Sequence, residues 1–280
     1  MQRKYGSILQ YSWIDTPDGK QCLASLLHRN DRRSFGLLEG PPLDASKCNA
    51  EVSYKVFFCG RAGAGKTSVI SRLNGRPVPE NHYETLGAQS SLLFWPVRIA
   101  QAKKTVLVKL HLWEAGEGAM NRYDHILPTC IDEVHAVVFT ASFCHKASWE
   151  DIPKLIARLE LPDSVLKIVM VTHLDLQSKH LITEEDILSF EQDWGIPVLR
   201  VANNPAVHIV DGMTGLRQSA PTLNRLCELL WFKDQVKAGV VREPVSYCFQ
   251  DTLKDSLKLK GNNEEAQTSS EREKVKITFC

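Results

Sequence analysis

Short apolar runs alternate with amphipathic segments between residues 51 and 240, and this pattern predicts an α/β domain. The strand candidates are 54–59, 91–99, 105–113, 135–141, 167–172 and 197–201. The segments with the helical spacing of apolar residues are 66–74, 119–132, 146–160, 184–193 and 220–238. Lys103-Lys104 separates the second run from the third, as the turn of a hairpin does. We therefore expect ligands at the carboxyl edge of an α/β sheet.

Residues 1–50 have a different character and are predicted to be an N-terminal extension with one helix. A capping cluster, Asp15-Thr16-Pro17-Asp18, precedes apolar residues that share one helical face: Cys22, Leu23, Leu26 and Leu27. The basic run 29–33 that follows is either a solvated helix end or a docking element. At the other end, residues 241–280 are polar and are predicted to form a disordered tail.

Charge and composition argue against several classes of protein. The 280 residues include 34 Lys and Arg against 33 Asp and Glu, a balance that predicts no nucleic-acid groove and no basic membrane face. None of the eight cysteines has C-x-x-C spacing to another, so neither a zinc site nor a redox pair is predicted, and a reducing, cytosolic setting is expected. Prenylation needs a Cys four residues from the end, where this chain has Ile277, so we expect no lipid anchor.

A glycine-rich loop links the first predicted strand to the first predicted helix. Its sequence, Gly60-Arg61-Ala62-Gly63-Ala64-Gly65-Lys66-Thr67, matches G-x-x-x-x-G-K-[ST], whose backbone N–H groups surround nucleotide phosphates. The unpaired amides and the dipole at a helix N-terminus also favour an anion there. The predicted phosphate-binding residues are Arg61, Ala62, Gly63, Ala64, Gly65, Lys66, Thr67 and Ser68. The alternative is a glycine turn with a solvated Lys.

A second element follows nineteen residues after Lys66, where Thr85 begins a Thr-Leu-Gly tripeptide. In small GTPases of the Ras and Rab type, a Thr at this spacing closes over the γ-phosphate and Mg²⁺. A loop Thr suits that task because its hydroxyl oxygen binds the metal while the loop stays free to open. We therefore predict that Thr67 and Thr85 are ligands of Mg²⁺.

The third element is Trp113-Glu114-Ala115-Gly116-Glu117 at the end of the third predicted strand. It is one residue shorter than the W-D-x-x-G-Q pattern of GTPases and has Glu in place of Asp. We expect the Gly116 N–H to bind a γ-phosphate. Glu117 occupies the position of the Gln that orients the attacking water, and the γ-phosphate would repel its carboxylate, so slow intrinsic hydrolysis is predicted and no catalytic residue is assigned.

The fourth element follows the fifth predicted strand, where GTPases have N-K-x-D for recognition of guanine. Here Asp175 is placed to accept hydrogen bonds from the base, while Thr172 and His173 replace Asn and Lys. Thr172 and His173 are also predicted to be nucleotide-binding residues, with the His173 ring able to stack on the base. After the last strand, the Ala202 N–H is predicted to bind the guanine O6. The alternative for this element is a surface loop with an ordinary Asp.

Together these motifs make the chain resemble the Rem- and Rab-like small GTPases of the ciliogenesis and planar polarity effector group, within the Ras-like P-loop superfamily. The segments that carry the resemblance are 33–39, 53–55, 82–85, 93–96, 113–117 and 123–127. The shortened third element and the missing lipid signal are shared with that group. The resemblance extends to about residue 239.

The resemblance implies a Ras-like fold, with a mostly parallel six-stranded sheet flanked by helices, that binds GTP and Mg²⁺. It implies a switch or assembly subunit in cilium biogenesis, basal-body cargo transport, planar cell polarity and exocytosis. The implied partners are the Fuzzy, Inturned and Wdpcp proteins, and the implied location is the cytoplasm, at the basal body and cytoskeleton.

Two alternatives remain open. The altered elements at 114–117 and 172–173 also suit a scaffold that holds nucleotide permanently or binds none. A P-loop kinase for small molecules would need an arginine-rich lid, for which residues 114–170 offer only Arg122 and Arg158.

Overall fold

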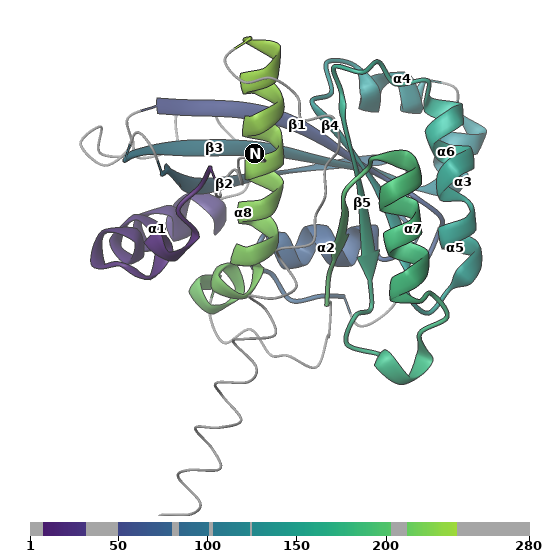
Figure 1. The fold of residues 1–280 in the computed structure, drawn as a ribbon, viewed down its shortest axis with the longest axis horizontal. Coiled ribbons are helices and arrows are strands. Elements are labelled where there is room, and N and C mark those ends of the chain that lie inside the picture. The colour runs from purple at the N-terminus through teal and green to yellow at the C-terminus, as the bar shows by residue number, and fades with distance from the viewer. Residues whose placement is uncertain are drawn as a thin grey trace, which may run out of the picture. The chain divides into compact units, whose positions relative to one another are not determined.

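A six-stranded sheet forms the centre of the computed structural model, which describes residues 8–31, 50–79, 84–100, 103–123, 125–202 and 212–239. The strands are β1 Ala50–Cys59, β2 Ala88–Ile99, β3 Lys104–Ala115, β4 Ala136–Ser142, β5 Leu166–Thr172 and β6 Val198–Arg200. Their order is β2-β3-β1-β4-β5-β6, with β2 antiparallel to β3 and the other pairs parallel (Figure 1). This confirms the predicted α/β fold and the hairpin, which turns at Lys103 with a positive φ of 50°.

Helices precede the first strand, occupy most of the connections between strands and follow the last strand. They are α1 Pro17–Asp31, α2 Lys66–Leu73, α3 Glu117–Arg122, α4 Ile126–Ile131, α5 Lys146–Glu150, α6 Ile152–Leu159, α7 Glu184–Trp194 and α8 Gly212–Lys237, with 3-10 turns η1 Tyr11–Asp15 and η2 Gln177–Lys179. None of the helices in the described ranges is long and apolar enough to cross a membrane. The predicted tail from residue 241 and the segment 33–39 lie outside the described residues, so the predicted domain limits stay predictions.

The single helix predicted over 119–132 is wrong, because the chain forms α3 and α4 with an extended residue, Tyr123, between them. Pro128 accounts for the break. Inside a continuous helix it would lack a hydrogen-bond donor and clash with the preceding turn. As the third residue of α4 it lies in the first turn, where the backbone N–H groups have no intrahelical partner in any case.

The helix predicted over 146–160 divides in the same way. Pro153 stands near the start of α6, and Asp151 joins α6 to α5.

The last helix differs from its prediction in where it starts. It begins at Gly212, eight residues before the predicted start, and contains Pro221 in its interior. A helix that packs along the sheet tolerates one internal proline because its buried side chains stabilise it.

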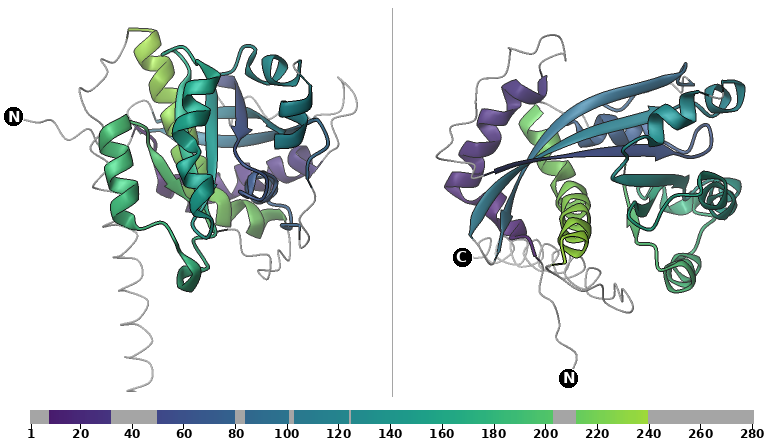
Figure 2. Two further views of the ribbon diagram at one scale, coloured as in Figure 1. Left: turned by 90° about the vertical axis from the view of Figure 1, so that its right-hand side faces the viewer. Right: turned by 90° about the horizontal axis from the view of Figure 1, so that it is seen from above.

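The alternation of side chains along β1 divides the core between the two faces of the sheet. Phe57 and Cys59 belong to an apolar cluster with residues of α4, α6 and α7. On the other face, the Tyr54 hydroxyl donates to Asp234 of α8 across 2.7 Å. Figures 1 and 2 show the helices of residues 117–194 gathered towards the β4–β5 end of the sheet, and α1 beside the β2–β3 hairpin.

The N-terminal extension is attached to the sheet through β2. Leu9 forms an antiparallel bridge with Ile99, and the Gln10 N–H donates to the Arg98 carbonyl across 2.9 Å. Trp13 and Cys22 are buried in a cluster with residues of the hairpin: Leu92, Phe94 and Leu107. The predicted helix is thus confirmed.

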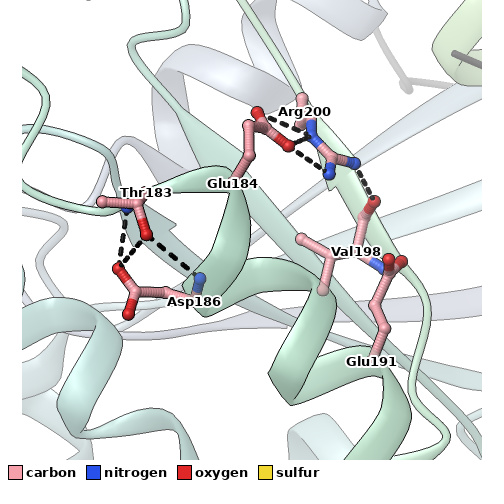
Figure 3. A network of polar contacts seen from close by, with 6 residues as sticks. All are labelled: Thr183, Glu184, Asp186, Glu191, Val198 and Arg200. Carbon is pink, nitrogen blue, oxygen red and sulfur yellow. Dashed lines mark hydrogen bonds and ion pairs between the residues drawn. The ribbon is translucent and has the colours of Figure 1, made fainter.

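Polar contacts fix β6 against α7 (Figure 3). Arg200 on β6 pairs with Glu184, with 2.6 Å between Nη2 and Oε2, and Glu191 accepts a hydrogen bond from the Val198 N–H across 2.8 Å. Thr183 and Asp186 cap the start of α7 reciprocally. These contacts set the position of the chain just after β6, where Ala202 lies.

Candidate nucleotide-binding site

The glycine-rich loop runs from the end of β1 to the start of α2, as predicted. Gly60 has a φ of +148°, and a Cβ there would lie 2.4 Å from the Thr140 carbonyl oxygen, so only glycine fits. Gly65 precedes α2 in the left-handed region, with no side-chain cap for the helix. The first amides of α2 are therefore directed to the loop, which is the arrangement that binds phosphate in this type of motif.

Lys66 reaches into the loop from the first turn of α2. Its side chain is buried, and Nζ donates to the carbonyl oxygens of Gly60, at 2.8 Å, and Arg61, at 3.2 Å. Burial lowers the pKa of Lys66, while the neighbouring Glu114 raises it. The ammonium group thus lies within the loop, and its contact with phosphate oxygens stays a prediction.

Side-chain oxygen atoms from three separate segments meet at the start of α2. Thr67 Oγ1 donates to Glu114 Oε2 across 2.8 Å and lies 3.4 Å from Thr85 Oγ1. Glu114, at the end of β3, is only 3% exposed, and burial raises the pKa of its carboxyl, although the bond from Thr67 opposes the shift. Hydroxyl and carboxylate oxygens are the ligands that Mg²⁺ prefers, so the donor set suits this ion.

Among the described residues, no cluster of three or more His, Cys, Asp or Glu side chains could hold a metal ion. A magnesium site here would therefore depend on Thr67, Thr85 and phosphate oxygens, with Glu114 beside them. Glu114 was not among the predicted ligands, because a Glu in place of Asp gives no indication of where its longer side chain ends.

The third element touches the phosphate loop through Glu117. The Ala62 N–H donates to Glu117 Oε2 across 2.7 Å. The Gly116 N–H, predicted to bind a γ-phosphate, donates to the Gly87 carbonyl across 3.1 Å. A phosphate at Gly116 would have to replace that bond.

Residues around Thr85 and those after β3 hold each other. Glu84 Oε1 accepts from the Gly118 N–H across 2.8 Å, a contact that the sequence did not suggest. A Cβ at Gly116 would lie 2.0 Å from the Thr85 carbonyl oxygen, so the two backbones are in direct contact. The segment around Thr85 and the segment after β3 are therefore packed together and hydrogen-bonded to each other.

The fourth element is connected to the phosphate loop by Thr172, which is fully buried at the end of β5. Its hydroxyl donates to the Ala64 carbonyl across 2.9 Å, and its Oγ1 also lies 2.8 Å from His173 Nδ1. Because Thr172 gives its only proton to Ala64, the second contact requires a proton on His173 Nδ1. Thr172 is thus a tether between the two loops.

His173 adopts a positive φ of 62° and is half-buried. Its Nδ1 also lies 2.9 Å from Ser142 Oγ, and burial lowers the pKa of the ring, while Asp175 raises it. The hydroxyl oxygens of Thr172 and Ser142 thus fix the position of the ring. Sequence reasoning missed Ser142, because a lone Ser at a strand end has no distinctive pattern.

Asp175 and Ala202 complete the set of predicted residues, and both are exposed. The Leu174 N–H donates to the Val201 carbonyl across 3.3 Å, so the segment before Asp175 and the segment before Ala202 are adjacent. All the predicted residues thus lie at the carboxyl edge of the sheet, where ligands bind in open α/β folds. Their roles in binding stay predictions.

Comparison with known proteins places this geometry in a family. The Ras family model matches residues 55–216, which is more than half of the chain. The chain is 42% identical over 242 residues to ciliogenesis and planar polarity effector 2 of Xenopus tropicalis, covering 84% of this chain and 95% of that protein. To the Homo sapiens protein of the same name it is 37% identical over 246 residues, covering 85% and 95%. The Arabidopsis thaliana Ras-related protein RABD2c is 20% identical over 178 residues, covering 62% and 84%. The chain therefore belongs to the Ras family and, within it, to the group of proteins called ciliogenesis and planar polarity effector 2.

Proposed function

We propose that the chain binds GTP with Mg²⁺ and acts as a slowly hydrolysing switch or assembly subunit in ciliogenesis and planar cell polarity. The observation that carries the proposal is the meeting of Thr67, Thr85 and Glu114 beside the buried Lys66 ammonium. These groups come from three separate segments, so their convergence is a feature of the fold. Membership of the Ras family supports guanine nucleotide as the ligand.

Each element has a distinct part in this proposal. The loop amides and Lys66 would hold the phosphates, and Asp175 with the Ala202 N–H would bind the guanine edge. Mg²⁺ would neutralise phosphate charge, with Thr67 and Thr85 as its protein ligands. Slow hydrolysis follows from Glu117, because a carboxylate is a poor substitute for the Gln that orients water in fast GTPases.

The cellular role is proposed from the relatives, whose name is ciliogenesis and planar polarity effector 2. We propose that the nucleotide-bound form joins the Fuzzy, Inturned and Wdpcp proteins at the basal body, in the cytoplasm and at the cytoskeleton. Cargo transport and exocytosis belong to the same proposal.

The test starts from protein purified without added nucleotide. Any nucleotide it carries is released by denaturation and identified by chromatography, and the Kd values for GTP and GDP are then measured with and without Mg²⁺. The Lys66→Ala variant is expected to lose nucleotide. Lys154→Ala, which removes an exposed lysine that pairs with Asp151, is the matched control and is expected to retain it.

A pull-down with the three candidate partners tests the switch. Loss of both nucleotide and partners in Lys66→Ala supports a switch. Partner binding that survives the loss of nucleotide would show a nucleotide-independent scaffold instead. Two hydrogen bonds favour this second candidate. The Ala62 N–H donates to Glu117 and the Gly116 N–H donates to Gly87, so two groups predicted to bind phosphate already have partners within the protein.

A further inference from the structure

Glu117 is bonded to the loop that would hold phosphate. Its Oε2 accepts the Ala62 N–H at 2.7 Å, a distance typical of a charge-assisted hydrogen bond. A carboxylate is an anion with the same preference for a cluster of backbone amides as a phosphate oxygen has. The contact therefore uses one of the loop donors for an internal anion.

The segment that carries Glu117 is held in this position from both sides. Before it, the Gly116 N–H donates to Gly87, and after it the Gly118 N–H donates to Glu84. Both acceptors belong to the segment around Thr85. Glu117 is therefore fixed on the loop by the same hydrogen bonds that join the two segments.

The terminal phosphate of a triphosphate is the group that meets these two segments in nucleotide switches. A diphosphate lacks this terminal group and is held by the loop amides and the Lys. A triphosphate would bring its terminal phosphate to the segment that carries Glu117, next to a carboxylate that already holds the Ala62 N–H, and the two negative charges would repel each other. A diphosphate avoids this repulsion.

We infer that Glu117 competes with the terminal phosphate for the phosphate loop, so that this site favours a nucleoside diphosphate over a triphosphate. This inference rests on the proposed function, since it concerns the same nucleotide. It makes Glu117 a residue that sets the preference between the two nucleotides, in addition to its poor fit for activating water. In this protein, loading with triphosphate has to displace an internal carboxylate first.

The experiment measures the Kd of the full chain for GDP and for a non-hydrolysable GTP analogue in Mg²⁺ buffer. Glu117→Gln keeps a side-chain oxygen for the Ala62 N–H but removes the charge, and Glu117→Ala removes both. In each variant, affinity for the triphosphate relative to the diphosphate is expected to rise about tenfold, which equals about 1.4 kcal/mol. The diphosphate affinity is expected to stay within about twofold of the wild type, and it also shows that the variant is folded.

The matched control is Glu150→Gln, which removes an exposed carboxylate that pairs with Lys146 on α5. It is expected to leave the ratio of the two affinities unchanged. An unchanged ratio in both Glu117 variants, with both nucleotides bound, would overturn the competition while leaving the proposed function in place. Absence of binding of either nucleotide to the wild type and to all variants would overturn both.

Discussion

Thr172 donates its hydroxyl proton to the carbonyl oxygen of Ala64, so the segment expected to bind the base is hydrogen-bonded to the loop expected to bind the phosphates. In the GTPase pattern this position is an Asn, which has a longer side chain with more donors. Thr has one donor, and it packs closely against the loop: a Cβ at Gly65 would lie only 3.1 Å from the Thr172 hydroxyl oxygen. The Thr172 side chain therefore connects the two loops through one hydrogen bond.

Thr172→Val is expected to lower the free energy of unfolding by about 1–3 kcal/mol, because the buried Ala64 carbonyl loses its partner. Urea unfolding measures the change. The chain offers a matched control in Thr140, whose buried Oγ1 has no hydrogen-bond partner among the described residues. Thr140→Val is expected to be neutral or stabilising, and equal losses in the two variants would contradict the role of the hydroxyl.

Gly116→Ala is expected to separate the Thr85 segment from the segment after β3. The new Cβ would lie 2.0 Å from the Thr85 carbonyl oxygen, a backbone atom that can move only if the segment moves. Hydrogen exchange of the amides from Leu86 to Ala88 should become faster. Gly118→Ala is expected to give a smaller increase, since there the Cβ meets the end of the Glu84 side chain, which can rotate away at the cost of one hydrogen bond. Equal exchange in the two variants would contradict the prediction.

His173→Asn is expected to make stability less sensitive to acid. Burial lowers the pKa of folded His173 below its usual 6.5, so the unfolded chain binds more protons and the wild type loses stability as the pH falls through about 6.5 towards the folded pKa. The urea concentrations at the midpoint of unfolding, measured at pH 7.5 and 5.5, give the loss of stability on acidification for the wild type and for His173→Asn. The buried carboxyls of Glu114 and Glu191, whose raised pKa values act in the opposite direction, are present in both proteins and largely cancel in the comparison. An equal loss in the two proteins would exclude this contribution.

Glu228→Ala is expected to loosen the N-terminal extension. The Glu228 carboxylate accepts from the Ile8 N–H at 2.9 Å and from the Tyr11 hydroxyl, and it pairs with Arg225 at 2.7 Å. Loss of hydrogen bonds to a buried carboxylate should cost about 2–3 kcal/mol. Cleavage by trypsin near the N-terminus, followed by mass spectrometry, should become faster. Tyr11→Phe removes one of the bonds and should give a smaller effect; unchanged cleavage in Glu228→Ala would contradict the attachment.

The sequence alone predicts the strands of this fold well, because buried parallel strands are continuous apolar runs bounded by turn residues. Helix continuity is harder to predict. Apolar spacing continues across Tyr123 and Asp151, and Pro128 and Pro153 act through local clashes that periodicity does not register. The early start of α8 is a tertiary effect, since its first turns pack against the end of α2: the Ser219 hydroxyl donates to the Arg72 carbonyl, and Gly215 lies against the backbone of Gly75.

For the candidate site, the motif spacing predicted which segments converge but not which side chains meet. Glu117 is an acid at a known position in the pattern, yet its contact with Ala62 depends on the shortened loop geometry. The bond from Thr67 to Glu114 depends on how a longer side chain folds back. Such contacts are set by distances between segments far apart in the chain, and a linear pattern does not contain these distances.

The two ends of the sheet differ in how they resist pairing with another chain. β6 is only 3 residues long, whereas β2 has 12 and would offer a long row of unpaired backbone groups. The extension covers part of that row through Leu9 and Ile99, and Pro96 cannot donate to a neighbouring strand. Residues 8–10 therefore cover part of the β2 edge, and a protein shortened to begin at β1 is expected to aggregate through the β2 edge that this exposes.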